Sequence, residues 1–251
     1  MHTKSVAFDG STFILNGRVG DDYFDHIQPE RPFTFAMGLL PRDAVCFDIG
    51  ANIGMTAVIA AKRSATVYAF EPDPAVMPFL EATIEANSGT VEAHHMALGA
   101  EEGSLSFYSN PISPAASHLV TGDTLGHSST ATVKVSTVDG FVLANNIDKL
   151  DFMKIDVEGF EIDVLRGARD TIARLQPAAL VEFNSFTMVG FRDINPRDLL
   201  RLVLELFPYV YRFKDGRPTP LDSDGAALAF IHDNLVSEGC VDDLYCSFAR
   251  I

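Results

Sequence analysis

The chain has 251 residues, of which 47 % are hydrophobic, and this composition excludes a disordered or low-complexity protein. Acidic residues outnumber basic ones by 34 to 19, a net charge of −15, so a nucleic-acid partner is not expected because its phosphates would be repelled. Three cysteines without metal-type spacing indicate neither a disulfide framework nor a zinc site.

Residues 1–42 predict an N-terminal cap that precedes the main pattern. Residues 5–15 alternate around Asp9-Gly10 and predict a hairpin, while Phe24–Ile27 and Phe33–Leu40 predict two short helices. The segment lacks the apolar core of a signal peptide, and no apolar stretch is long enough to span a bilayer. We therefore expect a cytoplasmic protein without a membrane partner.

The stretch from Val45 to Pro74 has the order strand, glycine turn, helix, strand and acidic residue. Glycines at the first turn allow positive φ and close approach of a ligand, and an acid at the tip of the second strand can bind both hydroxyls of a ribose. The stretch therefore predicts a nucleoside-binding βαβ unit. Its candidate cofactor-binding residues are Asp48, Gly50, Ala51, Asn52, Gly54, Glu71 and Pro72.

The spacing of the turn decides which nucleoside is expected. A dinucleotide fingerprint has the pattern G-x-G-x-x-G, whereas here Gly50 is followed by Gly54 and Asn52 occupies the place of the middle glycine. A pyrophosphate would meet the Asn52 side chain, and Asp48 favours an ammonium group over a phosphate. These features indicate S-adenosyl-L-methionine. An NAD-dependent oxidoreductase and a non-catalytic nucleoside-binding protein of the same fold remain alternatives.

The rest of the chain continues the alternation of strands and helices expected of a single α/β domain over residues 43–251. A weakly patterned stretch at 109–130, which contains His118, predicts a lid-like insert. The domain is expected to have a mostly parallel seven-stranded sheet with helices on both faces. Further strands are predicted at 90–95, 104–108, 132–138, 150–156, 178–183, 209–213 and 245–248, and further helices at 74–84, 139–145, 160–175, 195–206 and 225–237.

Three carboxylates follow neighbouring strands and supply the candidate chemistry: Asp156, Glu158 and Glu182. An alcohol nucleophile needs a base to take its proton, so Glu158 and His118 are the leading catalytic candidates. Asp156 is a third, although it could instead hold the ammonium end of the cofactor. The same carboxylates with Asn184 could suit Mg²⁺. Alternatively, Lys154 or an arginine could pair with Glu158 or Glu182, and no metal site is assigned.

Four motifs together resemble the FkbM family of S-adenosylmethionine-dependent methyltransferases: DIGANIG, FEPDP, Ala97-Leu98-Gly99 and KIDVEGFE at Lys154–Glu161. The resemblance extends from about Asp43 to about Phe213. It implies a Rossmann-like class I methyltransferase fold, a backbone contact from Ala97 to the cofactor, and O-methylation of a hydroxyl on a sugar or natural product. The acceptor's identity and the oligomeric state are not indicated.

Overall fold

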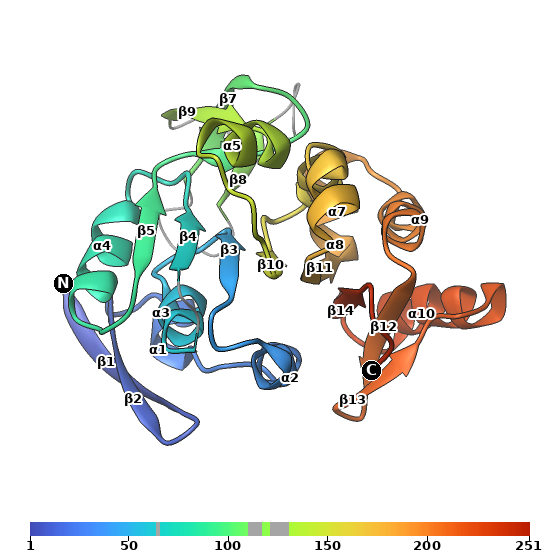
Figure 1. The fold of residues 1–251 in the computed structure, drawn as a ribbon, viewed down its shortest axis with the longest axis horizontal. Helices are drawn as coiled ribbons and strands as arrows, with labels where there is room; N and C mark the ends of the chain where they lie inside the picture. The colour runs from blue at the N-terminus through green and yellow to red at the C-terminus, as the bar shows by residue number, and fades with distance from the viewer. Residues whose placement is uncertain (64–65, 110–116, 121–130) are drawn as a thin grey trace.

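An eight-stranded sheet runs through the computed structural model, which describes residues 1–63, 66–109, 117–120 and 131–251 (Figure 1). In spatial order its strands are β13 (Arg217–Pro220), β12 (Tyr209–Lys214), β14 (Val241–Ser247), β11 (Ala178–Asn184), β10 (Phe152–Ile155), β3 (Val45–Ile49), β4 (Thr66–Phe70) and β5 (Val91–His94). The strands from β11 to β5 are parallel to their neighbours. Strand β14 is antiparallel to both β11 and β12, so the five parallel strands place their carboxyl ends along one edge.

The sheet has one strand more than the seven that the sequence predicts. The additional strand, β13, is a short edge strand that pairs antiparallel with β12 and places Pro218 opposite Phe213. Two prolines in four residues argue against a central strand, but an edge strand tolerates them because one side of it needs no ladder hydrogen bonds. The last predicted strand, 245–248, is instead the longer β14.

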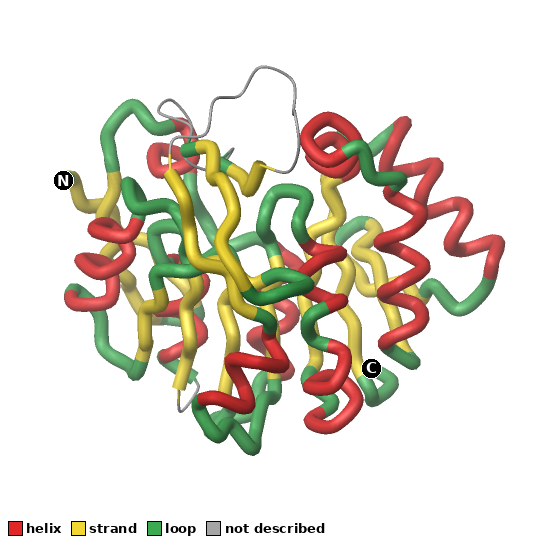
Figure 2. Tube along the Cα trace, turned by 90° about the horizontal axis from the view of Figure 1, so that it is seen from above, coloured by secondary structure: helices red, strands yellow, loops and turns green. Residues whose placement is uncertain are grey.

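Helices cover both faces of the sheet, as the sequence predicts (Figures 1 and 2). One face is covered by α5 (Val138–Ala144), α6 (Glu161–Arg166), α7 (Arg169–Leu175), α9 (Pro196–Leu206) and α10 (Asp224–Val236). The other face is covered by α1 (Asp22–His26), α2 (Arg31–Leu39), α3 (Met55–Ala61) and α4 (Met77–Glu85). Alternate strand residues separate the two cores: Phe47 and Ile49 belong to the first, and Cys46 belongs to the second.

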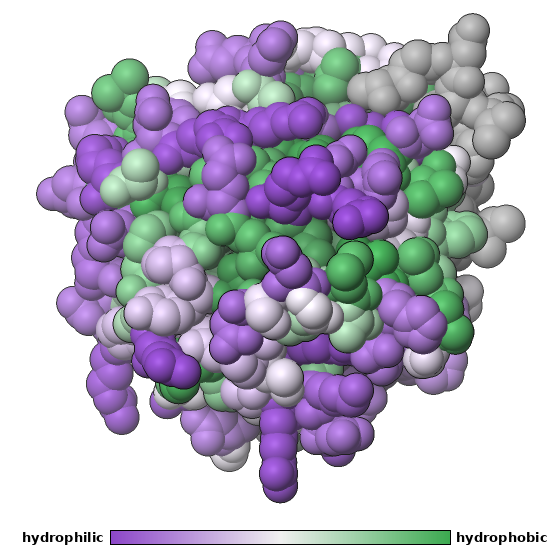
Figure 3. All heavy atoms as spheres, turned by 90° about the vertical axis from the view of Figure 1, so that its right-hand side faces the viewer, coloured by the Kyte–Doolittle hydropathy of each residue, from purple (hydrophilic) through white to green (hydrophobic). Residues whose placement is uncertain are grey.

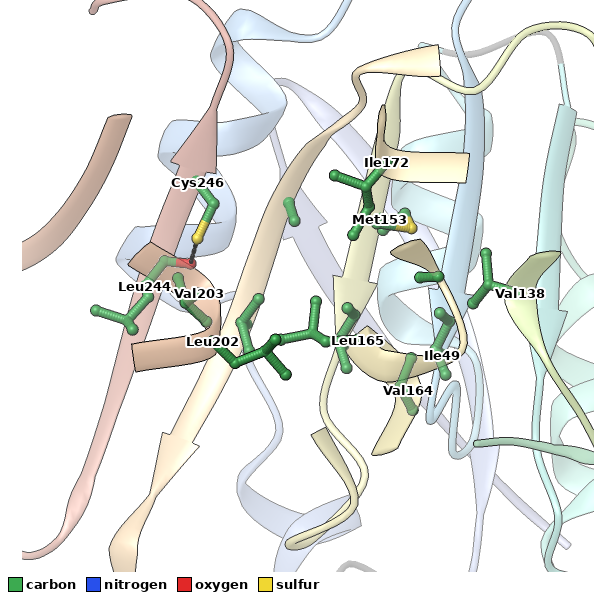
Figure 4. Close-up of a cluster of buried hydrophobic side chains, with 14 of the residues drawn as sticks. Ile49, Val138, Met153, Val164, Leu165, Ile172, Leu202, Val203, Leu244 and Cys246 are labelled. Carbon is green, nitrogen blue, oxygen red and sulfur yellow. Dashed lines mark hydrogen bonds between the residues drawn. The ribbon is translucent and has the colours of Figure 1, made fainter. Parts of the chain in front are cut away.

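The first core is drawn in Figure 4, where Met153 of β10 and Ile49 of β3 lie beside helix residues Val164, Leu165 and Ile172. All five side chains are at most 1 % exposed to solvent. Burial of apolar side chains on this scale supplies most of the folding free energy and fixes the strand ends that form the site.

The helix predicted for residues 160–175 is two helices, α6 and α7, which meet at Gly167. A Cβ atom at Gly167 would lie 2.1 Å from the carbonyl oxygen of Gly99, so only glycine permits this close approach of two backbones. The apolar spacing continues through the break, and for that reason the sequence pattern predicts one helix.

The N-terminal hairpin joins β1 (His2–Phe8) to β2 (Ser11–Gly17) and packs against α4. The backbone N–H of Asn16 donates to the Thr83 hydroxyl at 2.9 Å, and the backbone N–H of Ile14 donates to Asn87 Oδ1 at 3.0 Å. The hairpin and both N-terminal helices are present as predicted. The division at residue 42 into a cap and a domain stays a prediction, because α1 and α2 share the second core with β3 and α3.

A second sheet of four short strands lies above β4 and β5 in Figure 1. Its strands are β6 (Ala97–Leu98), β9 (Ala131–Ser136), β7 (Gly103–Tyr108) and β8 (His118–Val120). The lid-like insert predicted at 109–130 lies mainly outside the described residues, which in that range are Ser109 and residues 117–120.

On the side of the molecule that carries α9 and α10, apolar side chains are bordered by hydrophilic ones (Figure 3). Leu204 of α9 and Leu228 of α10 are exposed and line a groove between the two helices. Among the described helices, none has the length and apolar character needed to span a bilayer.

Candidate active site

A pocket of about 250 Å³ opens at the carboxyl ends of β3, β4, β10 and β11. Strand β8 and the N-terminal segment that contains α1 complete its walls. The predicted site residues that line it are Gly50, Asn52, Glu71, Pro72, Ala97, His118, Asp156 and Glu158. The predicted residues Asp48, Ala51 and Gly54 are buried beneath or beside the turn and do not line the pocket.

The glycine turn has a backbone that most side chains would not permit. Gly50 has a φ of +84°, and a Cβ atom there would lie 1.8 Å from the carbonyl oxygen of Asp156. Gly54 has a φ of +89° and caps α3, and its missing Cβ makes room for Leu80 of α4. Gly50 therefore lets β3 and β10 approach each other at the pocket floor, whereas Gly54 allows α3 to pack on α4.

Glu71 joins the turn to the tip of β4. Its carboxylate accepts the backbone N–H of Asn52 at 2.8 Å and that of Asp73 at 2.7 Å. Burial raises the pKa of Glu71 to about 7 despite these two hydrogen bonds. Asn52 itself has a φ of +50°, and its Oδ1 is shielded from solvent without a hydrogen-bond partner among the described residues.

Lys154 is a buried cation between two of the predicted carboxylates. Its Nζ lies 3.0 Å from Asp156 Oδ2 and 3.8 Å from Asp48 Oδ1, and it donates to the Gly50 carbonyl at 3.3 Å. Burial alone would lower the pKa of Lys154, but the charges of Asp156 and Asp48 outweigh it and raise that pKa. The predicted alternative, in which Lys154 pairs with Glu158 or Glu182, is wrong: its partners are Asp48 and Asp156.

Asp48 lies under the turn, where the Thr56 hydroxyl donates to its Oδ2 at 2.6 Å. Burial raises the pKa of Asp48, and the Lys154 charge opposes that rise. Asp48 Oδ1 is also shielded without a hydrogen-bond partner among the described residues.

Glu158 occupies a turn that the following helix braces. It has a φ of +53°, in the left-handed region that few non-glycine residues adopt. Glu161 Oε1 accepts the backbone N–H of Val157 at 3.0 Å and that of Gly159 at 3.2 Å, which holds the turn open toward the pocket. From α8 (Ser185–Arg192), Arg192 Nη1 donates to the Gly159 carbonyl at 3.2 Å.

The structure brings Asp156, Glu158 and Glu182 together, with one carboxylate oxygen of each within 4.8 Å of the others. Burial, followed by the charge of Asp156, raises the pKa of Glu158 to about 9 and that of Glu182 well above its ordinary value. Asn184, a possible Mg²⁺ ligand in the sequence, instead caps α8, where its Oδ1 accepts the backbone N–H of Thr187 at 3.2 Å.

His118 faces the pocket from β8 and is 2 % exposed. Its ring stacks on Phe191 of α8, with centroids 4.2 Å apart and planes inclined by 13°. The ring of Tyr108 lies near the same imidazole, with ring centroids 5.4 Å apart. Phe186, which is 63 % exposed, meets Phe191 edge-on, so aromatic rings continue from the pocket to the surface.

Two residues of the N-terminal segment that the sequence does not predict, Tyr23 and Glu30, also line the pocket. Burial raises the pKa of Tyr23, whose phenol lies in the field of Lys154 and Asp156. No motif marks either residue, because both reach the site through tertiary packing. Phe24 and Phe33 belong to the second core.

Residues 48–213 match the family described as the methyltransferase FkbM domain. The match covers more than half of the chain and includes the glycine turn, Glu71 and the segment from Asp156 to Glu161. The chain belongs to the FkbM methyltransferase family. The predicted family is thus confirmed, and S-adenosyl-L-methionine is the cofactor of this FkbM domain.

Two proteins of similar sequence support the assignment to the FkbM family. The hexuronic acid methyltransferase AglP of Haloferax volcanii is 29 % identical over 163 residues, which cover 65 % of this chain and 62 % of AglP. Methyltransferase 1 of Beauveria bassiana is 31 % identical over 150 residues, which cover 52 % of this chain and 60 % of that protein. The alignments thus span about three fifths of each relative's length.

Solved structures confirm the predicted fold class. An FkbM methyltransferase from Methylobacillus flagellatus superposes with a TM-score of 0.51 at 18 % identity, over 90 % of this chain and 50 % of that one. A 16S rRNA methyltransferase (RsmC) of T. thermophilus, solved with AdoMet and guanosine, gives a TM-score of 0.53 at 14 % identity, over 99 % and 50 % of the two chains. At these identities the likeness concerns the fold alone.

Proposed function

We propose that this chain transfers the methyl group of S-adenosyl-L-methionine to a hydroxyl oxygen of a sugar or another hydroxylated natural product. The observation that carries the proposal is a single pocket in which the cofactor candidates Gly50, Asn52 and Glu71 meet the catalytic candidates His118 and Glu158. The similarity to a hexuronic acid methyltransferase supports a sugar as the acceptor. When bound, the cofactor supplies an activated methyl group, whose bond to sulfur breaks as the bond to the acceptor oxygen forms.

The residues of the cofactor half of the pocket, which Gly50, Asn52 and Glu71 line, fit this ligand by their chemistry. The Glu71 carboxylate can accept hydrogen bonds from two ribose hydroxyls, and the shielded Oδ1 atom of Asn52 calls for a hydrogen-bond donor. Asp156, which pairs with Lys154, lines the pocket and offers a carboxylate to the ammonium group. No phosphate has to be accommodated, which agrees with the absence of a second glycine at position 52 of the turn.

The acceptor half of the pocket, which His118, Glu158 and Glu182 line, must position a hydroxyl and take its proton. Positioning alone supplies up to ~7–11 kcal/mol of barrier reduction in ideal cases, and a base contributes further. Glu158 and His118 both line the pocket and are the leading candidates to take the proton, with Asp156 as the third. A carboxyl whose pKa is raised is a stronger base once ionised, which suits Glu158 to an alcohol substrate.

The proposal is tested by incubating the chain with S-adenosyl-L-methionine and a panel of sugars and hydroxylated natural products, and measuring S-adenosylhomocysteine. We expect turnover with at least one acceptor, and slower turnover for Glu158→Gln and for His118→Gln at nearly unchanged cofactor affinity. Glu92→Gln, at a solvent-exposed position of β5, is the control that should retain parental turnover.

Two results would contradict the proposal. Greater thermal stabilisation by NAD than by the same concentration of S-adenosyl-L-methionine would favour the oxidoreductase alternative, since the ligand with the higher affinity stabilises the fold more. Cofactor binding without turnover across the whole panel would favour a non-catalytic binding protein.

A further inference from the structure

Two of the three clustered carboxyl groups in the pocket, those of Glu158 and Glu182, have no basic partner among the described residues. Glu158 and Glu182 have no Lys or Arg nitrogen within 4.0 Å, whereas Asp156 has Lys154 at 3.0 Å. The stretches outside the described residues contain neither Lys nor Arg, and their one basic residue is His127. Lys154 is already shared between Asp156 and Asp48.

Glu182 provides a second, independent sign that a ligand is missing. Its Oε2 exposes less than 1 Å² to solvent and accepts no hydrogen bond from any described residue. The side chain nevertheless lines the pocket, and one of its oxygens lies within 4.8 Å of ligand atoms on Asp156 and Glu158. A shielded carboxylate oxygen without a partner is costly unless a cation or a donor arrives with a ligand.

We propose that Asp156, Glu158 and Glu182 bind a hard divalent cation of the Mg²⁺ or Mn²⁺ type in the acceptor half of the pocket. Oxygen ligands from carboxylates are those that these ions prefer. Binding would release any protons that these carboxyl groups hold, because a metal ion binds their ionised form. In this arrangement Asp156 binds the ion through the oxygen that is not paired with Lys154, in place of the ammonium group of the cofactor.

The three ligands come from elements that hold them in place. Asp156 follows β10, Glu182 lies near the end of β11, and these two strands pair directly in the sheet. Glu158 stands on the left-handed turn that Glu161 braces through two backbone hydrogen bonds. The cluster is thus held by the sheet on one side and by a fixed turn on the other.

A cation at this cluster would leave His118, and not Glu158, as the base. The cation's role in catalysis rests on the proposed methyl transfer, whereas its binding to the chain does not. The ion would hold the acceptor's hydroxyl oxygen and lower the pKa of that hydroxyl, and Glu158 would then be a ligand and not the base. His118, on the opposite strand β8, would take the proton as the bond from oxygen to methyl carbon forms.

The test is an electron paramagnetic resonance titration of the EDTA-dialysed chain with MnCl₂, in which bound Mn²⁺ loses the signal of the free ion. We expect one Mn²⁺ per chain, and an affinity about tenfold or more weaker for Glu182→Gln and for Glu158→Gln. The control Glu30→Gln removes an acid that lines the same pocket outside the cluster, and should bind Mn²⁺ within about threefold of the parent because solvent and salt screen its charge.

Absence of Mn²⁺ binding by the parent, or binding that neither substitution weakens, would overturn the inference. Circular dichroism verifies folding, and if Glu182→Gln unfolds the chain, the turn variant Glu158→Gln decides alone. Calorimetric titration of the metal-free chain with S-adenosyl-L-methionine measures cofactor binding independently of the cation. Cofactor binding without Mn²⁺ binding refutes the cation alone, whereas loss of cofactor binding refutes the proposed function.

Discussion

Replacing Lys154 by methionine is expected to destabilise the fold because it removes the cation between Asp48 and Asp156. The Lys154 side chain is 14 % exposed and that of Asp48 is 4 % exposed, so water cannot replace the lost charge at Asp48. Removing one partner of a buried ion pair costs about 3–5 kcal/mol. Asp156 is 38 % exposed and keeps access to water, which places the expected loss near the lower end, at about 3 kcal/mol.

The chain offers a matched control in Lys149, which lies 3.0 Å from Asp43 and 3.4 Å from Asp151 but is 41 % exposed. Lys149→Met should cost less than about 1 kcal/mol, since exposed ion pairs contribute little. Urea unfolding followed by far-UV circular dichroism gives both free energies.

Adding Asp48→Asn to Lys154→Met removes the charge left unpaired and should recover part of the stability. The asparagine keeps an oxygen that can accept the Thr56 hydroxyl. Equal losses for Lys154→Met and Lys149→Met, or no recovery in the double variant, would refute the reasoning.

Three further substitutions test other parts of the site. Glu71→Gln should weaken S-adenosyl-L-methionine binding about ten- to hundredfold by calorimetry, since hydrogen bonds to a charged group are worth ~1.5–3 kcal/mol each; an unchanged dissociation constant would remove Glu71 from the cofactor site. Gly50→Ala should cost at least about 2 kcal/mol in urea unfolding, because its Cβ would meet the Asp156 carbonyl, whereas Gly10→Ala, also at positive φ but in open space, isolates the backbone cost. Relative to the parent, Glu158→Gln should become more stable as pH rises. The pKa of the Glu158 carboxyl is raised from 4.5 to about 9 in the folded protein. The stability that this carboxyl contributes is therefore fully present below pH 4.5 and is lost toward pH 9, at up to about 1.4 kcal/mol per pH unit. A stability difference that stays constant between pH ~5 and ~8 would argue against this shift.

The sequence alone determined the parts of the site that depend on short spacing along the chain. The interval from Gly50 to Gly54 and the acid at Glu71 indicate a nucleoside site without a pyrophosphate, because turn conformation and strand-tip chemistry are local properties. The alternation of apolar runs likewise predicts an α/β sheet with helices on both faces. The sequence does not predict the break at Gly167 or the edge strand β13, since an apolar pattern does not indicate a close approach of two backbones or a position at the edge of a sheet.

Only the tertiary structure decided which charges face one another. The sequence places Lys154 two residues from Asp156 but does not show that it turns to Asp48 on the neighbouring strand. Nor does it show that Glu182 meets Glu158, since strands far apart in the chain are brought side by side by the sheet register. Electrostatic interactions act through space over a few ångströms, so the distribution of charge in this pocket follows from packing and is not written in any local motif.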